Sequence, residues 1–345
     1  MQKKKIKLYL LLVFALFIFV VYFSLKDNYM DIINALLGVK IGYLFIGILF
    51  VFMSKYLIGL ILYYLTKKEK KDTKLKKMLH IAFIYPFFAG ITPGSLGGES
   101  FEIFYIKDTG VPAGKASNVT IQKYILYQIS LILVNSIAVI LNLFTNIIPN
   151  TDLVKFSVIL NFIVNIALLS ILYLLAYNKK FNHFIMNHGL SFLHKIKIIK
   201  DLEKTQKKLD NYLDNFDEGV DKLKKDKKLF IKLVGISMLS LIFLIGAAFP
   251  IARALNINSI SVLNLFIIAT FVKMISLLIV TPGNSGAAEY CFIYLLTGLL
   301  ANEDIMAYML IWRFVTYYIP LISGGILAMT WGRGDKNEKN DSVKS

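Results

Sequence analysis

The chain has 345 residues, of which 57% are hydrophobic and 18% are charged. A soluble domain of this length would need far more polar surface to cover its core, so the composition predicts an all-α protein that crosses a membrane several times. The formal net charge of +17 comes mainly from lysines that gather in a few segments, which favours a role in membrane topology over binding to nucleic acid.

Six apolar runs are long enough to cross the hydrocarbon layer, which takes about 20 residues of helix. In chain order these runs cover residues 6–24, 41–65, 117–146, 156–177, 229–251 and 305–331. The first resembles a secretory signal sequence, but no small-residue cleavage site follows it, so we expect an uncleaved membrane helix. Lysines concentrate in residues 3–7, 67–77 and 179–232. The positive-inside rule therefore places these segments and both termini on the cytoplasmic side of a bacterial cell membrane.

A polar insertion at residues 178–228 separates the fourth and fifth runs. Within it, apolar residues recur at steps of seven, four or three and predict an amphipathic helix: Leu202, Leu209, Leu213, Phe216, Val220 and Leu223. Such a helix either packs under the membrane domain, lies on the membrane surface or binds a partner. We expect one membrane domain over residues 1–331 with this insertion, followed by a charged cytoplasmic tail at residues 332–345.

Two further apolar stretches, residues 81–110 and 263–300, contain Pro and Gly where a spanning helix would run. Proline removes a backbone donor and glycine lowers helix propensity, so we predict that each stretch is broken into two re-entrant half-helices. Both contain the pattern T-P-G-x-x-G, as TPGSLG from Thr92 and TPGNSG from Thr281, and a glutamate follows each. Three spanning helices separate the two stretches, which predicts an inverted-topology repeat, an architecture typical of transporters.

The broken segments also predict where a substrate binds. Irregular backbone at membrane depth is tolerated only where protein or a water-filled cavity satisfies it, and the N-terminus of a half-helix favours an anion such as a lipid phosphate. The predicted phospholipid site near the midplane consists of Thr92, Pro93, Gly94, Ser95, Gly97, Gly98, Glu99, Lys123, Lys273, Thr281, Pro282, Gly283, Asn284, Gly286, Glu289 and Arg313. We expect the glycines to serve backbone shape before substrate contact.

Ionisable side chains inside a bilayer cost about 2.5–3.5 kcal/mol each on insertion scales, so each needs an explanation. Glu99 and Glu289 either bind a lysyl ammonium, take up a transported proton or cap the half-helices in which they lie. Arg313 either pairs with Glu289 or binds a phosphate through bidentate hydrogen bonds. Lys123 and Lys273 either contact phosphate or extend to a membrane interface.

Three more charged residues follow the first motif. We expect Glu102, Lys107 and Asp108 to approach the cytoplasmic surface, where they can guide headgroups inward. The basic cytoplasmic loops attract anionic headgroups as well, with each Lys contributing about 1 kcal/mol near the surface.

The remaining residues offer little for metal or enzymatic chemistry. Cys291 is the only cysteine, and the spacing of His183, His188 and His194 matches no standard zinc signature, so we expect neither a metal nor a cofactor. No Ser-His-Asp or Cys-His arrangement can be placed at one depth in the membrane, and we therefore do not expect an enzyme.

The chain resembles the flippase-like membrane domain of the lysylphosphatidylglycerol synthase family, which includes the multiple peptide resistance factor. The resemblance rests on TPGSLGGE at residues 92–99, TPGNSGAAE at residues 281–289 and WRFVTYYIPLISGG at residues 312–325, and it spans nearly the whole chain. It implies transport of aminoacylated phosphatidylglycerol or a related lipid from the inner to the outer leaflet. A cationic lipid displayed there repels cationic antimicrobial peptides.

Family members that synthesise the lipid carry a large soluble aminoacyl-transferase domain after the membrane part, and this chain stops soon after Trp331. The resemblance therefore implies transport without the lysyltransferase activity that the family name suggests. The chain has Glu102 and Lys123 where arginines are common in the family, and Asn284 with Ser285 in its second motif. These differences leave the headgroup open, polyprenyl carriers included.

Two alternatives to a transporter stay open. One is a membrane-embedded lipid transferase that acts with a separate synthase. The other is a scaffold that docks a soluble synthase through the basic helix at residues 196–228. The expected partners are the phospholipid substrate and the bilayer, with a separate soluble synthase and a second copy of the chain left open.

Overall fold

The structure of the protein is a computed structural model that describes residues 37–92, 96–181, 183–184, 188, 202–224, 226–279, 284 and 286–331. Within these residues every named element is a helix, and none is a strand. The all-α class predicted from composition is therefore confirmed for this part of the chain. The predicted first span at residues 6–24, the tail at residues 332–345 and the centres of both T-P-G turns lie outside the described residues.

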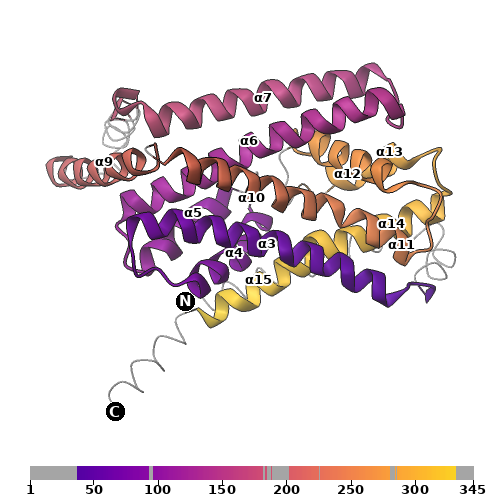
Figure 1. Cartoon of the computed structure of the whole chain (residues 1–345), viewed down its shortest axis with the longest axis horizontal. Coiled ribbons are helices and arrows are strands. Elements are labelled where there is room, and N and C mark those ends of the chain that lie inside the picture. Colours follow the sequence, from indigo (N-terminus) through magenta and orange to yellow (C-terminus); the bar gives the residue numbers. More distant parts are fainter. Residues whose placement is uncertain are drawn as a thin grey trace, which may run out of the picture. The chain divides into compact units, whose positions relative to one another are not determined.

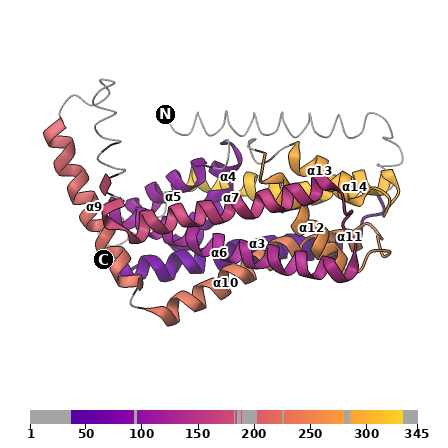
Figure 2. The ribbon, with the colours of Figure 1, turned by 90° about the horizontal axis from the view of Figure 1, so that it is seen from above.

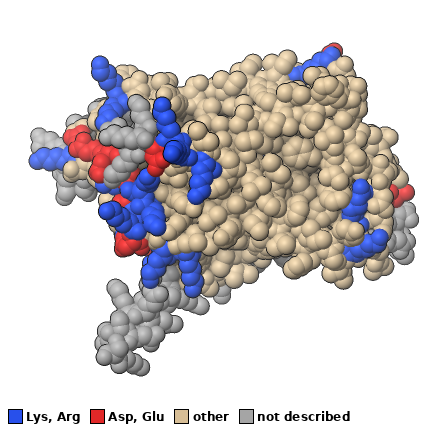
Figure 3. Space-filling model, in the orientation of Figure 1, with Lys and Arg blue, Asp and Glu red and all other residues tan. Residues whose placement is uncertain are grey.

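Five helical runs in the described residues are long and apolar enough to cross a membrane. They are α3 (Ile41–Glu69), α6 (Ala113–Thr145), α7 (Asp152–Tyr177), α10 (Lys227–Gly246) continued by α11 (Ala248–Ala254), and α14 (Asn302–Arg313) continued by η1 (Phe314–Tyr318) and α15 (Ile319–Thr330) (Figure 1). These runs correspond to five of the six predicted spans. Only 11% of the most apolar window of α7 is buried, so most of this helix presents apolar side chains outward. The face drawn in Figure 3 consists largely of uncharged residues, as a surface in contact with lipid requires.

Both predicted interruptions are present. In the first stretch, α4 (Leu75–Gly90) ends before the T-P-G turn and α5 (Leu96–Asp108) begins after it. In the second, α12 (Val262–Ser276) and α13 (Ala287–Leu296) flank the other turn in the same way. Each broken stretch is followed by a long spanning run, α6 in one case and α14 to α15 in the other. The two halves thus share an order of elements, while their inverted orientation stays a prediction.

The chain folds into two compact units, each assembled from separated stretches of sequence. Unit 1 comprises residues 1–53, 82–99 and 243–345, and unit 2 comprises residues 54–81 and 100–242. The described residues on either side of both T-P-G turns therefore belong to unit 1. The prediction of a single membrane domain over residues 1–331 stays a prediction.

In unit 1, the second broken stretch packs closely against the last spanning run. The helix α13 contacts both α12 and α14, and Figure 2 shows α13 beside α14. The ring of Phe292 on α13 stacks on Trp312 of α14, with the ring centroids 4.8 Å apart. The backbones of α4 and α15 also approach closely, because a Cβ atom added at Gly324 would lie 2.7 Å from the carbonyl oxygen of Phe83. These contacts fix the positions of the candidate site residues.

In unit 2, hydrogen bonds between amide side chains join α6 to α7. Asn135 on α6 donates its Nδ2–H to Oδ1 of Asn161 on α7 at 3.1 Å, and Asn165 donates to the same oxygen at 2.9 Å. Hydrogen bonds of this kind hold helices together in a bilayer, where the hydrophobic effect gives no net attraction between apolar helix faces.

The predicted amphipathic helix is present in unit 2 as α9 (Leu202–Lys224), and it packs against α6. Its residues Leu213 and Phe216 are buried, and Glu218 forms an ion pair with Lys115 of α6 at 2.7 Å. The chain itself therefore covers the apolar face of this helix, which supports a structural role for α9.

We expect Gly114→Ala to loosen α9 from α6. A Cβ atom at this position would overlap the carbonyl oxygen of Tyr212 and lie 3.0 Å from the amide nitrogen of Phe216, and the backbone of α9 would have to move away. Overpacking of this kind costs about 1–3 kcal/mol. Limited trypsin digestion should then cut the lysines of α9 faster than in the wild type.

Gly235→Ala is the matched control, because Gly235 lies in the helix α10 and a Cβ atom there would have no described atom within 4 Å beyond its own stretch of helix. It should leave the digestion rate unchanged. Equal cleavage rates in the two variants would contradict the docked position of α9.

Candidate functional site

The second broken segment begins its half-helix α13 at a glycine with positive φ. Gly286 has φ 84°, a conformation that glycine adopts without steric cost, and its amide donates to Oε2 of Glu289 at 2.8 Å. Glu289 thus satisfies one of the backbone donors that the start of a helix leaves open. Its predicted role as a helix cap is confirmed, and the amide of Gly286 is already engaged.

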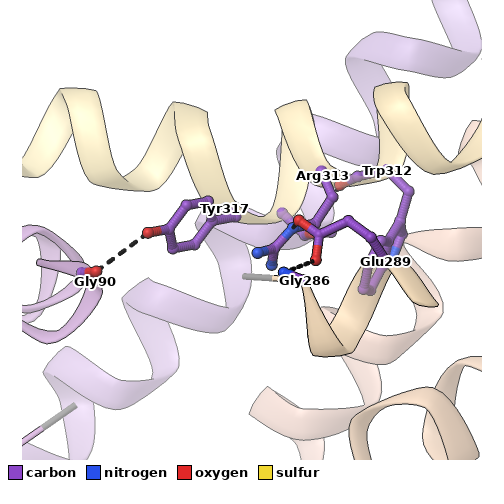
Figure 4. Close-up of polar contacts among 7 residues, drawn as sticks. Gly90, Gly286, Glu289, Trp312, Arg313 and Tyr317 are labelled. Carbon is purple, nitrogen blue, oxygen red and sulfur yellow. Dashed lines mark hydrogen bonds and ion pairs between the residues drawn. The ribbon is translucent and has the colours of Figure 1, made fainter. Parts of the chain in front are cut away.

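The other carboxylate oxygen of Glu289 pairs with Arg313 at the end of α14. The Nε–H of Arg313 donates to Oε1 of Glu289 at 2.7 Å (Figure 4). Both side chains are deeply buried, with exposed fractions of 10% for Glu289 and 6% for Arg313. The predicted pairing of these two residues is confirmed. Such a pair satisfies both charges, but its desolvation cost makes it weak evidence for a purely stabilising role.

A tyrosine that the sequence did not single out extends this pair to the first broken segment. The guanidinium carbon of Arg313 lies 4.4 Å from the ring centroid of Tyr317, within cation–π distance. The hydroxyl of Tyr317 donates to the carbonyl oxygen of Gly90, the last residue of α4, at 3.1 Å (Figure 4). A continuous path of contacts in unit 1 therefore links Gly286, before α13, to the end of α4.

Tyr317 lies in η1, a single turn of π-helix between α14 and α15. Such turns are rare in proteins, and those that do occur often lie at functional sites. Tyr317 lies in the stretch WRFVTYYIPLISGG, but within it the residue stood out only as part of the aromatic run Phe314, Tyr317 and Tyr318. That run looks like ordinary membrane packing, which is why sequence reasoning missed it.

In the first broken segment, a threonine side chain forms hydrogen bonds to the backbone on both sides of the turn. The Oγ1 atom of Thr92 accepts the amide N–H of Gly97 at 2.9 Å and donates to the carbonyl oxygen of Phe88 at 2.8 Å. The Oε1 atom of Glu99 accepts the hydroxyl of Tyr85 at 2.5 Å. The ring of Tyr85 packs against Gly98, because a Cβ atom added at Gly98 would lie 2.7 Å from a carbon of that ring.

These contacts bring together Thr92, Gly97, Gly98 and Glu99 of the predicted site, and they separately join Gly286, Glu289 and Arg313. Asn284 is half-buried with φ 54°, and Lys273 is half-buried on α12. The other predicted site residues in the two turns lie outside the described residues: Pro93, Gly94, Ser95, Thr281, Pro282 and Gly283.

A second buried ion pair lies in unit 2. Lys123 on α6 donates from Nζ to Oε2 of Glu102 on α5 at 2.8 Å, and the exposed fractions are 9% and 0%. The prediction that Glu102 approaches the surface is therefore wrong. The ammonium of Lys123 offsets the carboxylate charge, which makes the burial of Glu102 possible. Lys107 and Asp108, one to two turns further along α5, are exposed as expected.

Comparison with known proteins places the chain in a family. The model of the "Lysylphosphatidylglycerol synthase TM region" family matches residues 9–324. The chain belongs to this family. The match includes both broken segments, both buried ion pairs and Tyr317, so the candidate site lies wholly within the family's membrane region.

A curated relative supports the same assignment at the level of a membrane protein. A UPF0104 membrane protein from Archaeoglobus fulgidus is 25% identical to the chain over 255 residues, which cover 72% of this chain and 74% of that protein. Together with the five apolar spans, the family match makes this a multi-pass membrane protein of a lipid-related family.

The site of this family member offers charged and backbone groups for a ligand. Among the residues that the structure describes, no cluster of three or more His, Cys, Asp or Glu could hold a metal ion. What the described site provides is a guanidinium, several carboxylates and the ends of short helices, groups that recognise charged headgroups by hydrogen bonding and electrostatics.

Proposed function

We propose that this protein is a lipid transporter that moves an anionic or aminoacylated phospholipid, of the lysylphosphatidylglycerol class, from the inner to the outer leaflet. The observation that carries the proposal is the buried pair of Glu289 and Arg313 at the second broken segment, joined through Tyr317 to the end of the first. The family match to a lysylphosphatidylglycerol synthase membrane region supports a lipid substrate.

The physical argument begins with the cost of the ion pair. A bilayer penalises each ionisable group, and an ion pair in place of apolar side chains seldom stabilises a protein. A pair that is buried at the interruption of a membrane helix is therefore better explained by binding of a charged substrate. A phosphate suits Arg313 because its planar guanidinium can donate two parallel hydrogen bonds to two oxygens.

Transport further requires that the site change between two arrangements. In the proposed cycle, the headgroup phosphate binds Arg313 beside the Glu289 carboxylate, which keeps its bonds to Arg313 and to the amide of Gly286. Tyr317 contacts both Arg313 and the carbonyl of Gly90, so a shift of the guanidinium on phosphate binding would reach the first broken segment. The two segments would then move together as the headgroup crosses.

The experiment uses purified protein in liposomes and a fluorescent phospholipid whose transbilayer movement is followed by dithionite quenching. The double variant Glu289→Gln/Arg313→Gln removes both charges together and so avoids an unpaired buried charge. It should fold, while transport falls about 10–100-fold, the equivalent of a lost charged hydrogen bond of about 1.5–3 kcal/mol.

Lys155→Gln is the control, because the ammonium of Lys155 is exposed and lies 3.9 Å from exposed Asp152. It removes one positive charge without touching the site and should transport at the wild-type rate. A folded double variant that transports as fast as the control would contradict the proposed role of the pair.

A further inference from the structure

Three glutamates lie in the half-helices that follow the two T-P-G turns, and they differ in whether a cation is paired with them. Glu289 is paired with Arg313, and Glu102 is paired with Lys123. Glu99 instead accepts a hydrogen bond from the neutral phenol of Tyr85 at 2.5 Å. Among the residues that the structure describes, no cation forms an ion pair with Glu99.

The environment of Glu99 is suited to a ligand. The residue lies in the first turn of α5, and it is half-buried, so it is neither sealed in the core nor free in solvent. The bond to Tyr85 and the packing of that ring on Gly98 fix one carboxylate oxygen in place. A charged group held in one orientation by its neighbours is preorganised for binding.

Glu99 also belongs to the unit that contains Arg313. An aminoacylated phospholipid carries a phosphate together with at least one ammonium, and in the proposed transporter the phosphate binds Arg313. The ammonium then needs an acceptor whose charge is not already offset by the protein. Glu102 and Glu289 have their own cations, whereas Glu99 meets a neutral donor among the described residues.

We propose that Glu99 binds the ammonium of the headgroup and makes the site selective for aminoacylated phospholipids over phosphatidylglycerol. The inference rests on the proposed transport function and adds the residue that sets the choice of substrate. A polyprenyl phosphate has no ammonium and gains nothing from Glu99.

The test compares the transport of labelled lysylphosphatidylglycerol and labelled phosphatidylglycerol in the same liposomes. The wild type should move the lysyl lipid faster. Glu99→Gln keeps the hydrogen bond from Tyr85 but removes the charge, so the lysyl lipid should slow by about tenfold or more, with phosphatidylglycerol unchanged. Glu303→Gln, at an exposed glutamate in the first turn of α14, is the matched control and should keep the wild-type ratio.

A second variant covers the case in which Glu99→Gln does not fold. Tyr85→Phe retains the charge of Glu99 but removes the bond that orients it, so the rate ratio of lysyl lipid to phosphatidylglycerol should fall, though less than with Glu99→Gln. An unchanged ratio in Tyr85→Phe and in any folded Glu99→Gln would overturn the inference.

Other outcomes separate this inference from the transport function. If the wild type moves both lipids at equal rates, transport stands and the role of Glu99 is wrong. If Glu99→Gln keeps the lipid ratio but abolishes the effect of a transmembrane pH gradient, Glu99 carries a proton instead, and the inference is also wrong. If the wild type moves neither lipid, the transport function and the inference fail together.

Discussion

Replacing Arg313 by methionine should lower the free energy of unfolding by about 3–5 kcal/mol, because it leaves the Glu289 carboxylate buried without its cation. The exposed fraction of Glu289 is only 10%, so water cannot replace the lost partner. The substitution also removes the cation–π contact with Tyr317. Denaturant or thermal unfolding of the purified protein in detergent micelles measures this loss.

The double variant Glu289→Gln/Arg313→Met distinguishes a lost ion pair from lost packing. Glutamine can still accept the amide of Gly286 through its side-chain oxygen, so the double variant should recover most of the stability. Purely additive losses, with the double variant less stable than Arg313→Met, would show that the buried charge is not the cause.

A loss of similar size is expected in unit 2 for Lys123→Met. The side chain of Glu102 has an exposed fraction of 0%, and without Lys123 its buried charge would lose the cation that offsets it. Breaking such a pair costs about 3–5 kcal/mol, so the unfolding transition should shift clearly toward lower denaturant concentration.

The same helix offers a control for this prediction. Lys115 on α6 also forms an ion pair at 2.7 Å, but its partner Glu218 has an exposed fraction of 53%. Solvent can stabilise Glu218 when Lys115 is lost, so Lys115→Met should cost less than about 1 kcal/mol. If the two lysine variants lose the same stability, burial of Glu102 is not what makes its ion pair matter.

The architecture was largely predictable, because it depends on local sequence features. Apolar runs of sufficient length predicted five spans that the structure contains, and the prolines and glycines of the T-P-G motifs predicted both interruptions. These features act within a few residues of chain, through the length a bilayer demands and through missing or weakened helix propensity. The T-P-G motif occurs twice, and this repetition predicted that the two halves share an order of elements.

The partners within the site were only partly predictable. The pairing of Glu289 with Arg313 was expected, because both residues stood out as charges in apolar segments. Glu99 and Glu289 looked equivalent in the sequence, yet one meets Tyr85 and the other meets Arg313. Which side chains face one another across helices depends on how the helices pack, and the repeated motif carries no information about that.

Two features were not predicted from the sequence, for related reasons. Glu102 was expected near the surface together with Lys107 and Asp108, and Lys123 meets it only once α5 and α6 pack together. Tyr317 lies in a π-helical turn, which shifts the register of side chains around the helix. Tyr317 follows Arg313 by four residues, but this spacing alone does not reveal the hydrogen bond from the Tyr317 hydroxyl to the carbonyl of Gly90.

The central claim is that this protein moves a phospholipid across the bilayer, and the most direct measurement is transport by the wild type alone. Purified protein in liposomes would be offered labelled lysylphosphatidylglycerol, phosphatidylglycerol and a polyprenyl phosphate, one lipid at a time. We expect lysylphosphatidylglycerol to cross faster than in protein-free liposomes and faster than the other two lipids. If no lipid crosses faster than in protein-free liposomes, although the protein is folded in them, the transporter is contradicted and a scaffold or partner-dependent enzyme takes its place.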